Sequence, residues 1–190
     1  MKIEDIFSNF PTLEGERIRL RKLTSHDAEN LFFYASRPEV TKYVTWETHQ
    51  TIEDSKQFIN YVLELYKESK IAPLGIEDKS TGKLIGTADF VSWNINHRNS
   101  EIGYVLSPDY WGKGIVPEVV SLLFKFGFNQ MNMERIQARC FVENNASERV
   151  MQKVGMKFEG ISRHAMFIKG QFVDLKIYSI IKNDYQLLTK

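Results

Sequence analysis

The residues best suited to chemistry in this sequence are two glycines, Gly112 and Gly114, which flank Lys113. They follow a stretch with strand character and precede one with helix character. Glycine has no Cβ, so backbone N–H groups at such a place can approach a phosphate closely, and a helix start adds positive potential. The pattern indicates an anion site, with an ordinary tight turn as the alternative because such turns are common.

Two familiar phosphate-binding motifs do not match this segment. A dinucleotide-binding fingerprint needs a third glycine at the position of Pro117. A Walker A loop needs Ser or Thr directly after Lys113, where this chain has Gly114. The sequence therefore disfavours a dinucleotide or a nucleoside triphosphate as the bound anion.

Cysteine and histidine usage gives no sign of disulfide or metal chemistry. The single cysteine, Cys140, excludes an internal disulfide, and we expect it to be a small buried side chain rather than a nucleophile. The histidines are scattered without the spacing of metal ligands, at His26, His49, His97 and His164. We expect no bound metal.

The first half of the chain must supply the scaffold that positions the glycines. Residues 16–23 alternate apolar and basic side chains, which is typical of a half-buried strand. Capping-box-like starts at Thr24–Asp27 and Thr51–Asp54 each precede apolar residues at helical spacing, so each predicts a helix. Residues 71–76 and 83–93 then predict two strands joined as a hairpin.

The second half predicts a strand on each side of the glycine segment and two more helices. Pro117 should occupy the first position of the helix after the glycines, where its missing N–H costs nothing. Asn144 or Asn145 should cap a short helix that stops at Gly155. The predicted strands are 100–106, 135–142, 156–167 and 172–181. Strands and helices do not alternate regularly, which indicates an α+β fold with a mixed sheet.

Composition predicts a single domain over residues 1–190 and limits its partners. Hydrophobic residues make up 43% of the chain, enough for a core without disulfides or metal. The 25 Lys and Arg against 24 Asp and Glu leave a net charge of +1, which disfavours direct binding of nucleic acid. No apolar stretch has the length of a membrane span, and one cysteine suits a reducing compartment, so we expect a cytoplasmic protein without membrane contact.

The sequence resembles GNAT N-acetyltransferases in four ordered segments. Residues 101–118, EIGYVLSPDYWGKGIVPE, are similar to the acetyl-CoA segment of that superfamily, whose loop reads Gln/Arg-x-x-Gly-x-Gly/Ala. Three more segments resemble the branch that acetylates the N-terminal alanine or serine of ribosomal proteins (RimJ/RimL type). They are RIRLR at Arg17–Arg21, Asn144-x-x-Ser147 leading to residues 153–160, and GQFVD at Gly170–Asp174 leading to Tyr178.

The resemblance implies the GNAT fold, a mixed central sheet of about seven strands flanked by helices, with acetyl-CoA as co-substrate. Backbone groups of the strand and the glycine loop would hold the pantetheine and the pyrophosphate. The residues expected to contact acetyl-CoA are Tyr104, Val105, Leu106, Trp111, Gly112, Lys113, Gly114, Ile115, Val116, Asn144, Ser147 and Lys153.

The loop departs from the family pattern at three positions. The Gln/Arg position is Asp109, whose negative charge would oppose the pyrophosphate. Val116 and Pro117 replace small residues, and Pro117 donates no amide. Binding should therefore depend more strongly on backbone N–H groups and on Lys113.

The resemblance also implies direct transfer of the acetyl group from the thioester to an amine, and it assigns candidate roles. Glu101 stands where related enzymes often carry a carboxylate general base; a solvated ion pair is the alternative. Asn144 would hold the pantetheine region and Ser147 would lie near the sulfur as an acid, although both residue types are also ordinary helix caps. Lys153 would pair with a CoA phosphate or lie on a solvated helix face.

The acceptor that the resemblance implies is the N-terminal α-amine of a protein. An α-amine with a pKa of about 8 is appreciably deprotonated near neutral pH, whereas a lysine amine of about 10.4 is not, so a modest base suits the former. The alternatives are a small-molecule amine such as a polyamine, an amino acid or an aminoglycoside, and a non-catalytic acyl-CoA-binding sensor. The exposed edge of the last hairpin would allow a homodimer.

Overall fold

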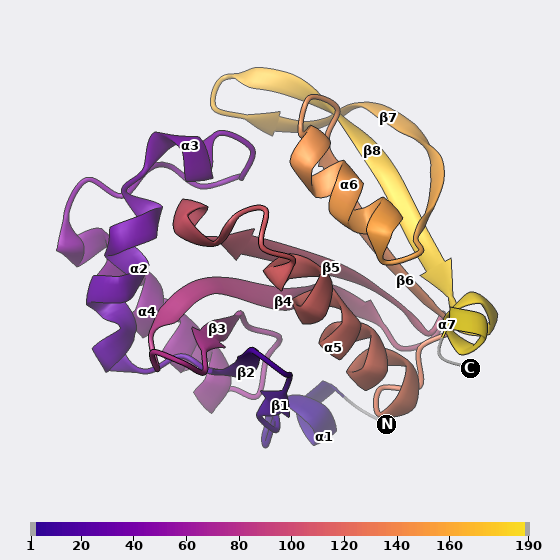
Figure 1. Ribbon diagram of the computed structural model, residues 1–190, viewed down its shortest axis with the longest axis horizontal. Helices are drawn as coiled ribbons and strands as arrows, with labels where there is room; N and C mark the ends of the chain where they lie inside the picture. Colours follow the sequence, from indigo (N-terminus) through magenta and orange to yellow (C-terminus); the bar gives the residue numbers. More distant parts are fainter. Residues whose placement is uncertain (1–2, 189–190) are drawn as a thin grey trace.

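The computed structural model, which describes residues 3–188, shows a mixed eight-stranded sheet with helices on both faces (Figure 1). The strand order is β1-β2-β3-β4-β5-β6-β8-β7, and β5 and β6 run parallel whereas the other neighbours run antiparallel. The strands are β1 (Leu13–Glu14), β2 (Ile18–Lys22), β3 (Leu74–Asp78), β4 (Leu84–Asn94), β5 (Asn99–Leu106), β6 (Arg135–Phe141), β7 (Lys157–Ile168) and β8 (Gln171–Ile181).

The helices divide between the two faces of the sheet. Helices α5 and α6 cover one face, and α2 and α4 pack together against the other (Figure 1). The helices are α1 (Ile3–Phe7), α2 (Ala28–Ala35), α3 (Pro38–Thr41), α4 (Ile52–Lys67), α5 (Ile115–Asn129), α6 (Asn145–Lys153) and α7 (Lys182–Leu188), with 3-10 turns at η1 (Ser25–Asp27) and η2 (Pro108–Tyr110). None of the helices within residues 3–188 combines the length and apolar character needed to cross a bilayer.

The α+β class and the order of the long elements are confirmed. Both predicted capping boxes, at Thr24–Asp27 and Thr51–Asp54, form. The sheet has eight strands rather than about seven because residues 13–14 add a two-residue edge strand. The short elements α1, α3 and α7 were not predicted, since segments of four to seven residues carry too few positions to show a period.

The predicted start of α5 at Pro117 is wrong. Gly114 adopts a left-handed conformation with φ of 75° and acts as the N-cap, so the helix begins at Ile115. Pro117 therefore occupies the third helical position rather than the first. Its missing N–H still costs nothing there, because the first four N–H groups of a helix have no partner within it.

Alternation along the central strands separates two apolar clusters. The residues of β5 at even positions, including Ile102 and Leu106, pack with the apolar face of α5 in the larger cluster. On the opposite face, Val105 packs beside the smaller cluster formed around α2 and α4. Side chains at odd positions of β5 therefore point away from α5.

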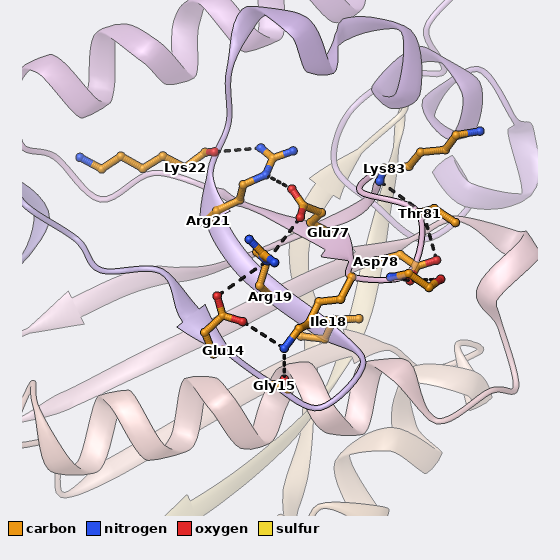
Figure 2. Close-up of polar contacts among 12 residues, drawn as sticks. Glu14, Gly15, Ile18, Arg19, Arg21, Lys22, Glu77, Asp78, Thr81 and Lys83 are labelled. Atoms are coloured by element: carbon orange, nitrogen blue, oxygen red, sulfur yellow. Dashed lines mark hydrogen bonds and ion pairs between the residues drawn. The ribbon is translucent and has the colours of Figure 1, made fainter.

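A buried ion network fastens the start of α2 to the sheet. Arg21 on β2 donates to both oxygens of Asp27, at 2.8 and 2.7 Å, and its Nε also pairs with Glu77 on β3. Figure 2 shows Glu77 lying between Arg21 and Arg19. Burial alone would raise the pKa of Asp27, but the bonds from Arg21 and Thr24 outweigh it and lower the pKa below its ordinary value.

We predict that Asp27→Asn lowers the free energy of unfolding by about 3 kcal/mol at pH 7. The substitution leaves the mostly buried Arg21 guanidinium without the carboxylate that accepts two of its hydrogen bonds. The carboxylate stabilises the fold above its unfolded pKa of about 3.9, and this contribution disappears as pH falls through the lower folded pKa. Urea denaturation should therefore show the two proteins converging towards pH 3.

The control is Glu53→Gln, which breaks an exposed pair with Lys56 and should change stability by no more than about 0.5 kcal/mol. Equal effects of the two substitutions would contradict the assignment of Asp27 as a structural carboxylate.

Candidate active site

The site is built where β5 and β6 part. The two strands pair at Asn99↔Arg135, Ser100↔Ile136 and Glu101↔Gln137, whereas β5 remains paired with β4 as far as Leu106. Beyond Glu101 the β6 side of β5 therefore lacks a strand partner among the described residues, and we call this opening the fork. The predicted cofactor residues Tyr104, Val105 and Leu106 lie in this part of β5, where the backbone groups that face away from β4 lack a strand partner.

The glycine loop lies between the end of β5 and the start of α5. Gly112 and Gly114 both have positive φ, 72° and 75°, a conformation that costs a residue with a side chain about 1–2 kcal/mol. The backbone N–H groups of residues 112–114 donate to no other described residue. The predicted anion site thus keeps its donors available beside the positive end of a helix.

Side chains around the loop play different parts. Lys113 is exposed, with its Nζ 5.4 Å from the centre of the Tyr110 ring. Trp111 donates its Nε1 to the carbonyl of Leu106 at 2.8 Å and so fastens the loop to the end of β5. Ile115 is buried in the core, so it can offer a ligand only its backbone. Val116 is partly buried against the same core.

Arg17, at the start of β2, holds the loop from behind. Its Nη1 and Nη2 donate to the carbonyls of Lys113 and Gly114 at 2.8 and 3.0 Å, and its Nε donates to Glu118 at 2.9 Å. With both carbonyls directed to Arg17, the N–H groups of the loop are directed elsewhere. Partial burial alone would raise the pKa of Glu118, but hydrogen bonds from Arg17 and Ile18 outweigh it and lower the pKa.

The unfavourable charge expected from Asp109 is offset by a partner from another element. Arg37, which precedes α3, donates its Nη1 to Asp109 at 2.8 Å and also pairs with Glu39. This ion pair is half exposed, so its contribution to stability is small. It nevertheless offsets part of the negative charge of Asp109, because the same guanidinium is shared with Glu39.

Tyr104 and Ser147 connect the two sides of the fork. The Tyr104 hydroxyl lies 2.9 Å from the Ser147 hydroxyl, and the Ser147 N–H donates to Asn144 Oδ1 at 3.1 Å. Asn144 is therefore the N-cap of α6, which confirms one of the two residues predicted to cap this helix. Burial raises the pKa of the Tyr104 phenol, which keeps it protonated and able to donate. No sequence pattern predicts this hydroxyl pair, because the two residues are 43 positions apart.

Two further residues considered in the sequence analysis differ in their relation to this pair. Cys140 is buried beside Ser147 and Tyr104, and burial raises the pKa of its thiol to about 11, so it is a poor nucleophile. Lys153 ends α6, about 9 Å along the helix axis from Ser147. It is exposed, and its role towards a CoA phosphate stays a prediction. Among residues 3–188, no group of His, Cys, Asp and Glu side chains is arranged to hold a metal.

The face of the sheet that points away from α5 carries two carboxylates of different character beside the fork. Glu101 accepts from Arg139 Nε and from Gln137 Nε2, both at 2.9 Å. Asp89 on β4 pairs across the sheet with Gly103, and no described residue donates a hydrogen bond to its carboxyl group. Burial, together with the negative charge of Glu101, raises the pKa of Asp89 to about 7. The sequence analysis missed Asp89, although a lone carboxylate in an apolar strand is a usable signal.

Comparison with known proteins agrees with this geometry. A family model described as an acetyltransferase (GNAT) domain matches residues 17–157. The chain is 39% identical over 173 residues to the uncharacterized N-acetyltransferase YoaA of Bacillus subtilis (strain 168), covering 91% of this chain and 98% of that protein.

Two solved structures share the fold over most of their length. The ribosomal-protein-S5-alanine acetyltransferase from Vibrio fischeri has a TM-score of 0.77 and 27% identity, covering 92% of this chain and 98% of that one. The microcin C7 self immunity acetyltransferase MccE, in complex with acetyl-CoA and AMP, has a TM-score of 0.77 and 25% identity, covering 87% and 93%.

A mixed sheet opened at a fork beside a glycine loop defines an acyl-CoA-dependent transferase. The chain belongs to the GNAT acetyltransferase family. It is an acetyl-CoA-dependent N-acetyltransferase.

We predict that Arg17→Met weakens the binding of acetyl-CoA about tenfold, because the carbonyls of residues 113 and 114 lose the guanidinium that orients them. Arg17→Lys should not restore binding, since one ammonium cannot replace the planar fork of donors. Titration calorimetry measures both dissociation constants. Arg19→Met is the matched control, because Arg19 pairs with Glu14 and Glu77 instead of the loop; the same loss in that variant would contradict the role of Arg17.

We also predict that Asp89→Asn stabilises the fold at pH 8 but not at pH 4. A folded pKa of about 7 against an ordinary value of 3.8 means that ionisation of the carboxyl penalises the folded state as pH rises from about 4 to 7. The full penalty is on the order of 4 kcal/mol. Denaturant titrations at the two pH values measure it, and a variant destabilised equally at both would show that the carboxyl group is satisfied by the fold.

Proposed function

We propose that this enzyme acetylates the N-terminal α-amine of a protein in the cytoplasm, with a ribosomal protein as the first candidate. The observation that carries the proposal is the charge beside the fork on the sheet face that points away from α5. We call this the acceptor face. Asp89 and Glu101 offer carboxylates there, while Arg139 pairs with Glu101 at the same place. A mixed set of charges suits one ammonium group better than a polycation, which would need a continuous acidic surface.

The elements around the fork support an extended acceptor. Lys169, in the turn between β7 and β8, donates to the carbonyl of Thr41 in α3 at 2.6 Å, so the hairpin reaches the α3 segment (Figure 1). The Tyr43 ring meets the Phe141 ring of β6, with centroids 5.8 Å apart. These contacts surround the approach to the acceptor face with polar and aromatic groups, which can contact several residues of a peptide.

The proposed binding of acetyl-CoA uses the residues that the sequence analysis predicted to contact it. The N–H groups of the loop from Gly112 to Val116, together with Lys113, would hold the pyrophosphate. Backbone groups of Tyr104, Val105 and Leu106 that face away from β4 would hold the pantetheine and the thioester carbonyl. Asn144 and Ser147 would lie on the other side, with Lys153 near a phosphate. Trp111 would support this arrangement by fastening the loop to β5.

The reaction is proposed as direct transfer in a ternary complex. The amine nitrogen forms a bond to the acetyl carbon, the carbon–sulfur bond breaks, and the CoA thiolate takes a proton. Glu101 is the proposed general base for the nitrogen, and Ser147, backed by the Tyr104 hydroxyl at 2.9 Å, is the proposed acid for the thiolate. Placing amine and thioester in one site removes the entropy cost of a bimolecular encounter.

A small-molecule amine is the second candidate. The chain is 25% identical to the microcin C7 self immunity acetyltransferase MccE, whose structure is a complex with acetyl-CoA and AMP. The enzyme can be tested with acetyl-CoA and either peptides bearing N-terminal Ala or Ser or a panel of polyamines, with free thiol as the readout. Release with peptides supports the proposal, release with polyamines alone moves the acceptor, and binding of acetyl-CoA without release indicates a sensor.

We predict that Glu101→Gln lowers turnover by about 100-fold and shifts its pH dependence, because a general base contributes on this scale. Affinity for acetyl-CoA should stay nearly unchanged. The matched control is Glu159→Gln, since Glu159 also pairs with an arginine of β6, Arg135, but away from the fork. Unchanged kinetics of Glu101→Gln at every pH would remove Glu101 from the mechanism.

A further inference from the structure

Asp89 lies on the acceptor face beside the fork. It faces Gly103 across the β4–β5 ladder, one residue before the part of β5 that would bind the thioester. A Cβ placed on Gly103 would come within 2.9 Å of Asp89 Oδ1. The glycine therefore leaves the room that the carboxyl group occupies, and the carboxyl group extends over the backbone of β5 where the strands part.

The groups around Asp89 do not satisfy it. Glu101 from β5 repels it, and Arg139 from β6 is paired with Glu101. Tyr66 from α4 is the other titratable group close enough to sense its charge, but the Tyr66 hydroxyl donates to the carbonyl of Pro73. No described residue donates to the carboxyl group. A half-buried carboxylate without a donor is costly, so this position suits a ligand that brings one.

We propose that Asp89 binds the ammonium group of the acceptor and removes the proton that makes its nitrogen nucleophilic. This inference rests on the proposed function and adds to it a second carboxylate. An ammonium group placed at Asp89 would supply the missing donor and would lie next to Glu101 and the unpaired backbone of β5.

The nitrogen of an ammonium acceptor loses two protons during the reaction, and the two carboxylates can take one each. The ammonium gives its first proton to Asp89 and becomes an amine. The amine attacks the acetyl carbon, Glu101 takes the second proton, and the carbon–sulfur bond breaks. The thiolate takes one proton from the Ser147 and Tyr104 hydroxyl pair. One of the two protons held by the carboxylates returns to this pair through solvent, so that amide, CoA thiol and one net proton are released. A single carboxylate would have to lose the first proton to solvent before it could take the second.

The match of acidities indicates which amines react. With a pKa of about 7, Asp89 exchanges a proton with an α-amine of about 8 at little cost, whereas a lysine amine of about 10.4 is over a thousandfold less acidic than the carboxyl group. Asp89 therefore favours a protein N-terminus over an internal lysine side chain. The selectivity arises from acidity as well as shape.

The first test is the pH dependence of kcat/KM for a peptide with N-terminal alanine. Asp89→Asn can use only amine that is already neutral, so its kcat/KM should be at least tenfold below that of the parent enzyme at pH 6.5 and within about threefold at pH 9. Affinity for acetyl-CoA should be unchanged. Asp184→Asn, a control in α7, should follow the parent enzyme. An equal loss at every pH, or no loss, would overturn the inference.

The second test needs no turnover and separates this inference from the proposed function. Carboxyl carbon NMR of aspartate-labelled protein should show one resonance, absent from Asp89→Asn, that titrates near pH 7. Glu101→Gln should lower its midpoint because a like charge is removed, and adding alaninamide should lower it further by supplying an ammonium. A titration near pH 4, or no response to alaninamide, would overturn the role of Asp89. Failure of thiol release with every amine would instead overturn the proposed function.

Discussion

The parting of β5 and β6 is the constraint on which the rest of the molecule depends. Parallel strands normally satisfy each other's backbone groups along their length, but here the pairing ends after Glu101 and Gln137. The backbone beyond that point must be satisfied by something other than a strand, and acetyl-CoA is the ligand that the family brings. The Tyr104–Ser147 contact and α6 keep the opening bridged instead of collapsed.

Two arginines adapt the glycine loop to this chain's own sequence. Arg17 directs two loop carbonyls away from the anion site, and Arg37 offsets the charge of Asp109, which stands where the family has Gln or Arg. Both come from segments far from the loop in sequence. The positive charge that the family's Gln/Arg position can supply is thus partly replaced by arginines from other elements. These contacts explain how Asp109 is accommodated in the loop.

The carboxylates show how burial distinguishes structure from chemistry. Asp27 is buried and fully engaged by Arg21 and Thr24, so its pKa falls and it stabilises the fold. Asp89 is placed in a similar strand-rich environment without a donor and beside a like charge, so its pKa rises and it opposes stability. A fold tolerates such a cost where a ligand can offset it, and both carboxylates would look alike in a list of acidic residues.

The sequence by itself determined the features that depend on local interactions. Capping boxes at Thr24 and Thr51 and the alternation over residues 16–23 involve neighbours within a few residues, and the helices and the strand that they predict are confirmed. The start of α5 was misplaced by two residues because the N-cap, Gly114, could not be told from an ordinary loop glycine.

Only the tertiary structure decided which side chains meet. A bulge between Phe90 and Ser92 sets the register that puts Asp89 opposite Gly103, and the fork arises from pairing that stops three residues into β6. Three arginine contacts of the site join residues far apart in sequence. Asp109 meets Arg37 from 72 residues away, and Glu101 meets Arg139 from 38 residues away. The carbonyl of Lys113 accepts from Arg17, 96 residues away. Such contacts depend on the whole sheet closing at once, so no local pattern can encode them, and the unpaired state of Asp89 is visible only when every neighbour is in place.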